Sequence, residues 1–401
     1  MKGLNREQKK AAGFTNGIAA VIAVPGSGKT LVMMERIGNL VKQYNVQPET
    51  IIGLTFNRNA AEQMRQRLVP VLGELAQRVT LSTIHSWCHY LLRTEGKVFE
   101  IISGKEQISM IRNLMKRKRL DLSVGTILSE ISLAKNNLIG VEEFRALYES
   151  DKTMIKVANI YESYEKEKAK KYLLDFDDLL LETYFLLNNN DAVREKYAGR
   201  YHHILIDEFQ DTNPVQLEII KLIVDADNNN DKSYWIAGDD WQSIYSFAGA
   251  SVNNILNFQS TFSSSTLFIL NINYRSTPQI LKACQNLISH NVRKIEKTLK
   301  TDNPEGDEVI VLESSSEEGE ALCLVNEINE LVGQRGYQYK DIAVLYRANF
   351  QSRVVEETFA QMKIPYYIEN GLNFYQRSEV RYLLDYLRLI NDPDSEEGDE
   401  A

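Results

Sequence analysis

The sequence contains only three cysteines, and they lie far apart, at Cys88, Cys284 and Cys323. Because no CxxC pair occurs, the cysteines predict neither a disulfide framework nor a zinc ribbon. No run of eighteen apolar residues exists, and the apolar stretch Ile18–Val24 is broken by the proline and glycine that follow it. The N-terminal residues MKGLNREQKK also lack the apolar core of a signal peptide. We therefore predict no membrane-spanning segment and expect a cytoplasmic protein.

Positive charge is also in short supply. Lysine and arginine number 46 against 55 acidic residues, which gives a formal net charge of −9. This balance excludes a uniformly basic nucleic-acid binder, but it leaves room for a local basic groove, since phosphate binding depends on local charge. With 401 residues, 43% hydrophobic and 25% charged, the chain has the composition of an ordinary globular protein of two or three domains.

Short apolar runs of strand length alternate with helical patterns over much of the chain. Strands that alternate with helices are typical of βαβ units, in which neighbouring strands run parallel. The sequence therefore predicts an α/β fold on a parallel sheet, with helices after Gly28 and over residues 59–72. The runs that we predict as strands are Ile18–Val24, Ile51–Phe56, Val79–Ser82, Ile204–Asp207, Tyr234–Gly238 and Leu267–Leu270.

Residues 96–200 interrupt this alternation, because they show almost no strand signal. Their apolar residues recur at helical spacing, for example Ile111 and Leu114, and we predict an all-helical insertion. Within it, EKEKAKK (Glu165–Lys171) predicts an exposed helical face with near-neighbour ion pairs. DFDDLL (Asp175–Leu180) predicts a helix start, to which we assign no chemistry.

A further group of apolar runs lies toward the C-terminus. These runs, Val309–Leu312, Ile342–Tyr346 and Tyr366–Ile368, predict the strands of a second α/β unit. The last residues, 392–401, are acidic and rich in turn formers. We expect them to form a frayed tail.

The segment AVPGSGKT predicts a phosphate-binding loop. It fits the pattern [AG]-x-x-x-x-G-K-[ST], follows a predicted strand and opens a predicted helix, which is the context that the motif requires. An ordinary glycine-rich turn between strand and helix is the alternative. In the motif reading, backbone N–H groups cradle the phosphates, Lys29 reaches the β- and γ-phosphates of ATP, and Thr30 ligates Mg²⁺. The residues predicted to contact nucleotide here are Ala23, Val24, Pro25, Gly26, Ser27, Gly28, Lys29 and Thr30.

The other half of such a site is an acidic residue at the end of a strand. The run Ile204–Asp207 supplies it, because the carboxyl ends of parallel strands are where α/β sheets bind ligands. Asp207 would hold Mg²⁺, and Glu208 would activate the attacking water as a general base. Many strands end in aspartate, so this pattern alone is weak evidence for a nucleotide site. It becomes specific only together with the phosphate loop.

Together with several further motifs, these residues resemble superfamily 1 DNA helicases of the UvrD/Rep/PcrA group. The motifs occur in the family's order and cover nearly the whole chain. A set of short motifs in one order is more specific than any single motif. The matching segments are Leu4–Gln8, Leu54–Met64, Ser82–Leu92, Asp175–Leu180, Asp207–Thr212, Gly238–Ala250, Asn273–Thr277, Tyr346–Arg353 and Gly371–Ile390.

The resemblance implies roles for four further residues at the nucleotide. Gln8 would read the adenine edge, and Tyr274 would stack on the adenine face. Gln242 would sense the γ-phosphate. Arg275 would enter from a second domain to neutralise charge on the transferred phosphoryl group, a role worth about 10³–10⁵ in rate.

The resemblance also implies single-stranded DNA, or a duplex with a single-stranded tail, as the partner. Aromatic faces would stack on successive bases without regard to sequence, and core packing is the alternative for each aromatic. Movement from 3′ to 5′ and a place in DNA repair rest on the resemblance alone. The residues expected to contact DNA are Thr55, Phe56, His85, Tyr245, Phe247 and Asn349.

The family also supplies expected domains. A first RecA-like domain would comprise 1–95 and 201–270, the helical insertion 96–200, and part of a second RecA-like domain 271–391. Family members continue for several hundred residues with motifs V and VI, so we expect this chain to be truncated and to unwind DNA poorly. Either the chain is a truncated product, or a second chain supplies the missing motifs, and we expect the isolated chain to be a monomer.

Two other functions remain open at this stage. A non-catalytic, nucleotide-gated DNA-binding module, or a subunit completed by a second chain, would bind ATP without turnover. A generic P-loop ATPase acting on proteins would show no stimulation by DNA. His85 and His89 are four residues apart and could be read as a metal pair, but without the glutamate of HExxH we predict no zinc.

Overall fold

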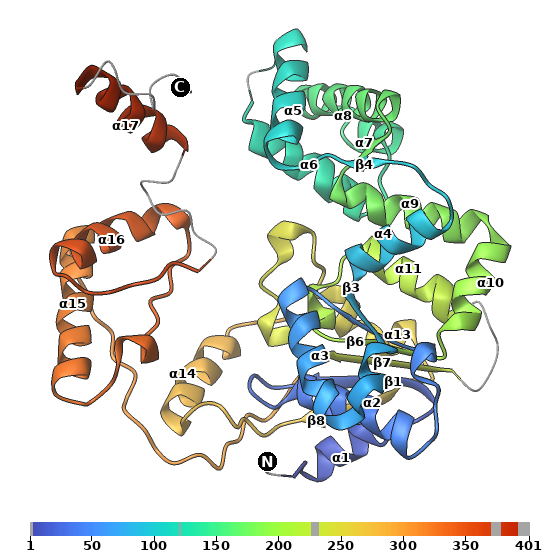
Figure 1. Ribbon diagram of the computed structural model, residues 1–401, viewed down its shortest axis with the longest axis horizontal. Helices are drawn as coiled ribbons and strands as arrows, with labels where there is room; N and C mark the ends of the chain where they lie inside the picture. The colour runs from blue at the N-terminus through green and yellow to red at the C-terminus, as the bar shows by residue number, and fades with distance from the viewer. Residues whose placement is uncertain (1–2, 119, 121, 226–231, 370–377, 392–401) are drawn as a thin grey trace. The chain divides into compact units, whose positions relative to one another are not determined.

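Six parallel strands form the central sheet of the computed structural model, which describes residues 3–118, 120, 122–225, 232–369 and 378–391 (Figure 1). Their order is β3–β2–β6–β7–β1–β8, and all neighbours are parallel. The predicted α/β fold is confirmed, with strand ends shifted by no more than one residue. The strands are β1 (Gly17–Ala23), β2 (Ile51–Thr55), β3 (Thr80–Thr83), β6 (His203–Ile206), β7 (Ser233–Gly238) and β8 (Thr266–Leu270).

Hydrophobic cores lie on both faces of this sheet. In β6, Ile204 and Ile206 belong to one core and Leu205 to the other, as the two-residue period of a strand requires. Because both faces are covered, the inner strands β1, β2, β6 and β7 are largely apolar, whereas the edge strand β3 reads TLST. One core includes residues of α4 (Ile84–Thr94), α9 (Phe176–Asn189), α10 (Asp191–Arg200) and α11 (Pro214–Asp225), and the other includes residues of α1 (Arg6–Ala12), α2 (Lys29–Lys42) and α3 (Arg58–Leu72).

The helical region between β3 and β6 has a core of its own, and Figure 1 shows its helices on one side of the sheet. The prediction that it is all-helical is wrong in one detail. Two very short strands, β4 (Glu100–Ile101) and β5 (Leu173–Leu174), pair in parallel, and two residues are too few to produce a periodic pattern. The helices around this core are α5 (Gly104–Lys118), α6 (Val124–Asn136), α7 (Val141–Leu147) and α8 (Lys152–Lys170).

The chain divides by its contacts into two compact units, residues 1–308 and 309–401. The predicted domain bounds, in which the second RecA-like domain begins at residue 271, stay a prediction.

No helix among the described residues combines the length and hydropathy needed to cross a membrane. The remaining elements of the first unit are α12 (Asn253–Leu256), α13 (Phe258–Thr261), α14 (Pro278–Ser289) and the short 3₁₀ helices η1 (Pro48–Thr50), η2 (Gly73–Gln77), η3 (Phe209–Asp211), η4 (Asp240–Gln242) and η5 (Ser246–Ala248).

The second unit contains α15 (Glu317–Gly333), α16 (Ser352–Gln361), α17 (Ser378–Asn391) and two 3₁₀ turns, η6 (Tyr339–Asp341) and η7 (Asn349–Gln351). Val325, Ile328, Phe359 and Ile364 form its small core. The tail predicted over 392–401 lies outside the described residues.

The three strands predicted in this second unit are wrong for the part of the chain that is described. Val309–Leu312, Ile342–Tyr346 and Tyr366–Ile368 are not in strands. A strand exists only through pairing with a neighbour, and β-propensity alone does not supply one. Their apolar side chains are accordingly exposed in several places, with Val311 at 81% and Leu345 at 92%.

Candidate functional site

The turn between β1 and α2 forms the predicted phosphate loop. Val24 donates its N–H to the last carbonyl of β8 at 2.9 Å, and α2 begins at Lys29. Gly26 and Gly28 have φ of +66° and +82°, a left-handed conformation that glycine adopts readily. A Cβ on Gly26 would lie 2.8 Å from Arg275 Cβ, so the loop can pass here only without a side chain. The turn leads into a helix N-terminus, which favours anions.

Two acids that follow β6 contact the start of α2. Thr30 Oγ1 donates to Asp207 Oδ2 at 2.8 Å, and Lys29 Nζ lies 2.7 Å from Glu208 Oε2. Glu208 has φ +52°, a left-handed conformation that costs a non-glycine residue about 1–2 kcal/mol. The structure thus brings together the four side chains that the sequence predicts for phosphate and metal chemistry.

Burial controls the ionisation of this group. Burial, followed by the Glu208 charge, raises the pKa of Asp207 to about 6, although the Lys29 charge opposes the rise. Burial also works against the charge of Glu208, but the Lys29 charge and the hydrogen bonds from Gln210 and Lys29 together outweigh it and hold the pKa of Glu208 below its usual value. Burial would lower the pKa of Lys29, but the surrounding carboxylates, Glu208 first, raise it. Lys29 and Glu208 are therefore a charged pair, whereas the Asp207 carboxylate is less well compensated than that of Glu208.

The donor set at this point suits magnesium. Thr30 and Asp207 offer a hydroxyl and a carboxylate oxygen, the hard oxygen ligands that Mg²⁺ prefers. Within the described residues, the buried atoms Ser27 Oγ and Asp239 Oδ2 have no hydrogen-bond partner. Ser27 belongs to the loop, and the Asp239 charge acts on Lys29. Unpartnered buried polar atoms beside the loop fit a site that is completed by a polar ligand.

Two residues that support this site were missed by the sequence analysis. Gln210 donates to Glu208 Oε2 at 2.9 Å and accepts from the Asp239 N–H at 2.9 Å. It therefore ties the general-base candidate to the end of β7. Lys297 is buried and donates to Ala23 O at 3.2 Å, Asp239 at 2.7 Å and Asp240 at 2.6 Å. The motif DEFQDT contains Gln210, but no local signal singles out Lys297.

The residues assigned to adenine lie beside the loop. Gln8 donates to Ser27 O at 2.9 Å and is buried. Tyr274 N donates to Gly26 O at 3.0 Å, and the Tyr274 hydroxyl accepts from Asn5 at 2.8 Å. The ring of Tyr274 is 43% exposed, so a face is available for stacking. Their adenine-binding roles stay predictions.

Arg275 and Gln242 complete the predicted nucleotide set. Asn273 donates to Pro25 O at 2.7 Å and accepts from Arg275 N at 2.8 Å, which holds Arg275 against the phosphate loop. The Arg275 charge also lowers the pKa of Glu208, by less than Lys29 and Gln210 do. By its contacts Arg275 falls within residues 1–308 together with the loop, and its entry from a second domain stays a prediction. Gln242 closes η4, half-buried, with its N–H on Asp239 O at 2.9 Å.

Three aromatic side chains from the DNA prediction form a row. The Phe56 and Tyr245 ring centroids are 4.5 Å apart, and those of Tyr245 and Phe247 are 5.9 Å apart. Phe56 is 38% exposed and Phe247 69%, so the core-packing alternative fails for these two rings. Asn349 lies in η7 of the second unit, and its role stays a prediction.

A cavity of about 110 Å³ separates part of this row from the acids. Burial lowers the pKa of His85 to about 4, so its imidazole is neutral at pH 7. Burial, followed by the Glu208 charge, raises the pKa of Asp211 to about 7. Thr55 is buried at the end of β2, and its hydroxyl has no partner among the described residues. The walls of the cavity include Thr55, Phe56, His85, Asp207, Glu208 and Asp211.

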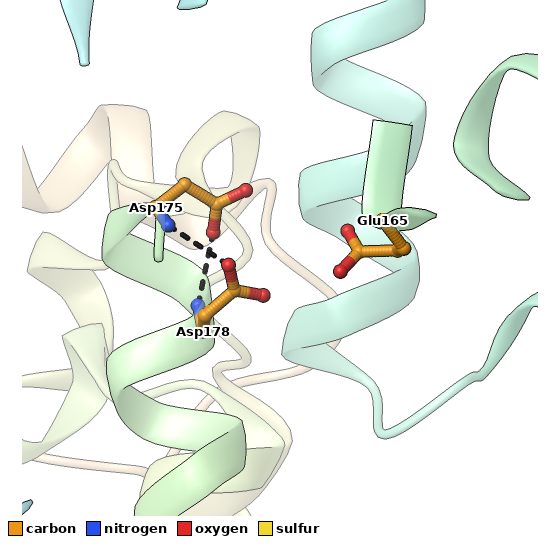
Figure 2. Close-up of side chains that lie close together, drawn as sticks. All are labelled: Glu165, Asp175 and Asp178. Atoms are coloured by element: carbon orange, nitrogen blue, oxygen red, sulfur yellow. Dashed lines mark hydrogen bonds between the residues drawn. The ribbon is translucent and has the colours of Figure 1, made fainter. Parts of the chain in front are cut away.

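A separate acidic cluster lies in the helical region, where Asp175 and Asp178 cap α9 reciprocally (Figure 2). One oxygen from each of Asp175, Asp178 and Glu165 lies within 4.8 Å of the others. Two buried lysines already supply cations: Lys135 contacts the three acids at 2.6–2.8 Å, and Lys168 contacts Glu165 and Asp175 at 2.9 and 3.0 Å and also bonds to Asp178. The prediction of an exposed face is therefore wrong for Lys168, because the carboxylates compensate its charge in the interior. The cluster is a compensated ion network.

Two family models together match most of the chain. Residues 4–263 match the UvrD/REP helicase N-terminal domain, and residues 268–397 match the UvrD-like helicase C-terminal domain.

Curated relatives give the same result. The chain is 35% identical to the ATP-dependent DNA helicase PcrA of Bacillus subtilis (strain 168), over 99% of this chain and 54% of that protein. It is 36% identical to the PcrA proteins of Staphylococcus epidermidis (strain ATCC 35984), over 97% of this chain and 54% of the relative, and of Leuconostoc citreum, over 98% and 53%. The chain thus spans about half the length of these relatives. It belongs to the UvrD/Rep helicase family.

Proposed function

We propose that the chain carries the ATPase site and a single-stranded DNA site of an ATP-driven DNA helicase. The observation that supports this most directly is the pairing of Lys29 with Glu208 and of Thr30 with Asp207. These pairs bring a phosphate-binding loop and two acids from a strand end into one site. The relatives described as ATP-dependent DNA helicases point to the same activity.

In this proposal, ATP binding replaces the ion pair between Lys29 and Glu208 with an ion pair between Lys29 and the γ-phosphate. The freed Glu208 carboxylate, kept near by Gln210, accepts a proton from the attacking water. The water oxygen bonds to the γ-phosphorus as the bond from that phosphorus to ADP breaks, so that ADP and phosphate are the products. Thr30 and Asp207 hold Mg²⁺, which neutralises charge on the phosphates when bound. Arg275, which lies against the loop, stabilises the negative charge that develops on the transferred group.

Single-stranded DNA is the partner that the aromatic row supports. Bases stack on exposed rings whatever their sequence, and Phe56, Tyr245 and Phe247 contact one another in that order. Thr55 and His85 adjoin Phe56 in the wall of the same cavity as Asp207, so DNA and nucleotide would act on neighbouring groups. By family resemblance we further propose 3′-to-5′ movement and a role in DNA repair.

The test is ATP turnover with and without a single-stranded oligonucleotide. We expect DNA-stimulated turnover in the parent chain and its loss in Lys29→Ala, because the phosphates lose their ammonium partner. Lys42→Ala is the matched control, since Lys42 is an exposed lysine at the other end of the same helix, and it should behave as the parent.

Two results would contradict the proposal. Tight ATP binding without turnover would favour a non-catalytic, nucleotide-gated module. Turnover that is indifferent to DNA, with no salt-dependent affinity for the oligonucleotide, would favour a P-loop ATPase that acts on other substrates.

A further inference from the structure

Asn136 is a buried polar residue at the last position of α6, outside every motif that defines the nucleotide and DNA sites. It is 3% exposed, and both the nitrogen and the oxygen of its side-chain amide have hydrogen-bond partners. Asn136 Nδ2 lies 3.2 Å from Ser132 Oγ and 3.2 Å from Asp177 Oδ1, and Asn136 Oδ1 accepts from Asn213 Nδ2 at 2.6 Å. One amide therefore joins α6, the start of α9 and the segment that follows the two acids.

Asn213 carries this contact to the ATPase acids. Its Oδ1 accepts from Gln216 N at 2.8 Å, and its own N–H is bonded to Gln216 Oε1 at 3.2 Å, so it caps the start of α11. Only a short segment, η3 with its flanking residues, connects Asn213 to Glu208. A displacement of Asn213 would therefore be felt at Glu208 and Asp211.

On its other side Asn136 supports the loop Tyr245–Ala250, which we call the aromatic loop. Gly249 has φ +84°, and a Cβ there would lie 3.1–3.3 Å from three atoms of the Asn136 side chain. The flanks of this loop are hydrogen-bonded to residues 207–213, which we call the acid-bearing segment. Ser243 Oγ donates to Gln210 O at 3.4 Å, and Ser251 N donates to Thr212 O at 3.0 Å. Asn136 thus lies beside the middle of a loop whose two flanks are hydrogen-bonded.

We propose that Asn136 is a positioning residue that couples DNA contact at the aromatic loop to ATP hydrolysis at Glu208. The loop carries Tyr245 and Phe247, and Asn136 contacts both this loop and the residue that ends the acid-bearing segment. Because the amide is buried and fully bonded, it holds one arrangement of the two segments rather than many. This inference rests on the proposed function, since it concerns the stimulation of turnover by DNA.

The first variant is Asn136→Ala. We expect turnover stimulated by single-stranded DNA to fall about fivefold to tenfold, in the range of coupling effects transmitted through packed networks. DNA-free turnover and the KM for ATP should stay close to the parent values, because Asn136 touches neither nucleotide nor reacting atoms. Asn137→Ala is the control: it is the same residue type at the next position, exposed, with its amide on Leu133 O of its own helix.

Two further variants separate coupling from simple loss of packing. Gly249→Ala disturbs the same contact from the opposite side and should lower DNA stimulation in the same way. Asn136→Asp alone places a second carboxylate against Asp177 and should also lower it. The double exchange Asn136→Asp with Asp177→Asn restores one carboxylate and one amide at the contact and keeps an acceptor for Asn213. We expect it to recover most of the stimulation.

The outcomes are distinct. If the parent shows no DNA stimulation, the proposed function fails and this inference fails with it. If the parent is stimulated and Asn136→Ala is stimulated equally, the coupling role alone is overturned. If Asn136→Ala loses DNA-free and DNA-stimulated turnover in equal proportion, and the double exchange recovers neither, Asn136 is only a structural residue and the inference is again overturned.

Discussion

Glu208 is held in a strained backbone conformation at the end of a buried strand, and its carboxylate meets Lys29. We predict that Glu208→Gln will keep ATP binding and lower turnover about 10²–10⁴-fold, the usual contribution of a positioned general base. The amide preserves the shape of the side chain but cannot accept a proton. Steady-state turnover together with the affinity for a fluorescent ATP analogue would measure both effects.

Glu218→Gln is the control for that experiment. Glu218 lies on α11, where it pairs with Lys221 at 2.7 Å on the surface, and a surface pair of this kind contributes little. It should turn over ATP as the parent does. Undiminished turnover in Glu208→Gln would remove Glu208 from the role of base.

Phe247 provides the second prediction at the scale of single residues. Its ring is 69% exposed, so its contribution to folding is small, whereas a stacked base is worth roughly 1–3 kcal/mol. Phe247→Ala should therefore weaken binding of a single-stranded oligonucleotide by that amount and leave the melting temperature unchanged. Phe185→Ala, at an exposed phenylalanine of α9, should change neither quantity. Equal DNA affinity in both variants would exclude Phe247 from the DNA site.

How far single residues could be predicted depends on where their partners lie. Lys29 and Thr30 were predictable because glycine and lysine at fixed spacing after a strand define the loop locally. Lys297 and Asn136 were not, because each acts on groups far away in the sequence: Lys297 on Ala23 and Asn136 on Asn213. From the sequence alone, a buried lysine cannot be distinguished from a surface lysine, because the carboxylates that compensate its charge, here Asp239 and Asp240, lie far away in the chain.

At the scale of elements, β6 contains a titratable side chain that opposes folding in acid. His203 is 5% exposed at the start of the strand, and its Nδ1 has no partner among the described residues. Burial, followed by the nearby Arg36 charge, lowers the pKa of His203 to about 4. The unfolded chain therefore binds more protons than the folded chain between about pH 6.5 and pH 4, and stability must fall as the pH falls through this window.

We predict that His203→Gln will reduce the loss of stability between pH 7 and pH 5 by about 2 kcal/mol. Urea unfolding at the two pH values gives the free energy of unfolding at each, and the difference between them cancels any general cost of the substitution. His202→Gln is the control, since the neighbouring histidine is exposed and its charge is the smallest of the three causes that act on His203, so it should change the difference far less. An identical pH dependence in all three proteins would show that His203 is not buried in its neutral form.

The elements also show why the second unit was harder to predict than the sheet. Ile204–Asp207 and Val309–Leu312 are similar apolar runs, but β6 pairs with strands on both sides, whereas the latter forms no strand. Composition reports the propensity of a run, and the presence of a partner decides its structure. The two-residue strands β4 and β5 were missed for the opposite reason, because pairing created them without any pattern.

At the scale of the whole molecule, the proposed sites are distributed unevenly between the two units. The phosphate loop, the acids, Arg275 and the aromatic row all lie within residues 1–308, and of the predicted site residues only Asn349 lies beyond them. The six-stranded sheet with its two cores also lies entirely in this unit. A unit with its own sheet and cores is expected to fold by itself.

We therefore predict that a chain ending at Glu308 will unfold cooperatively and bind ATP with an affinity within about threefold of the parent, a difference below 1 kcal/mol. It should also retain binding of single-stranded DNA through Phe56, Tyr245 and Phe247, weakened only by whatever Asn349 contributes. Denaturant unfolding followed by nucleotide and oligonucleotide titrations would measure the three properties on one sample, and Asn349→Ala in the parent gives the matching loss for the second unit. A shortened chain that folds cooperatively but binds no ATP would show that the second unit helps to build the nucleotide site, whereas loss of DNA binding well beyond that of Asn349→Ala would place further DNA contacts in residues 309–401.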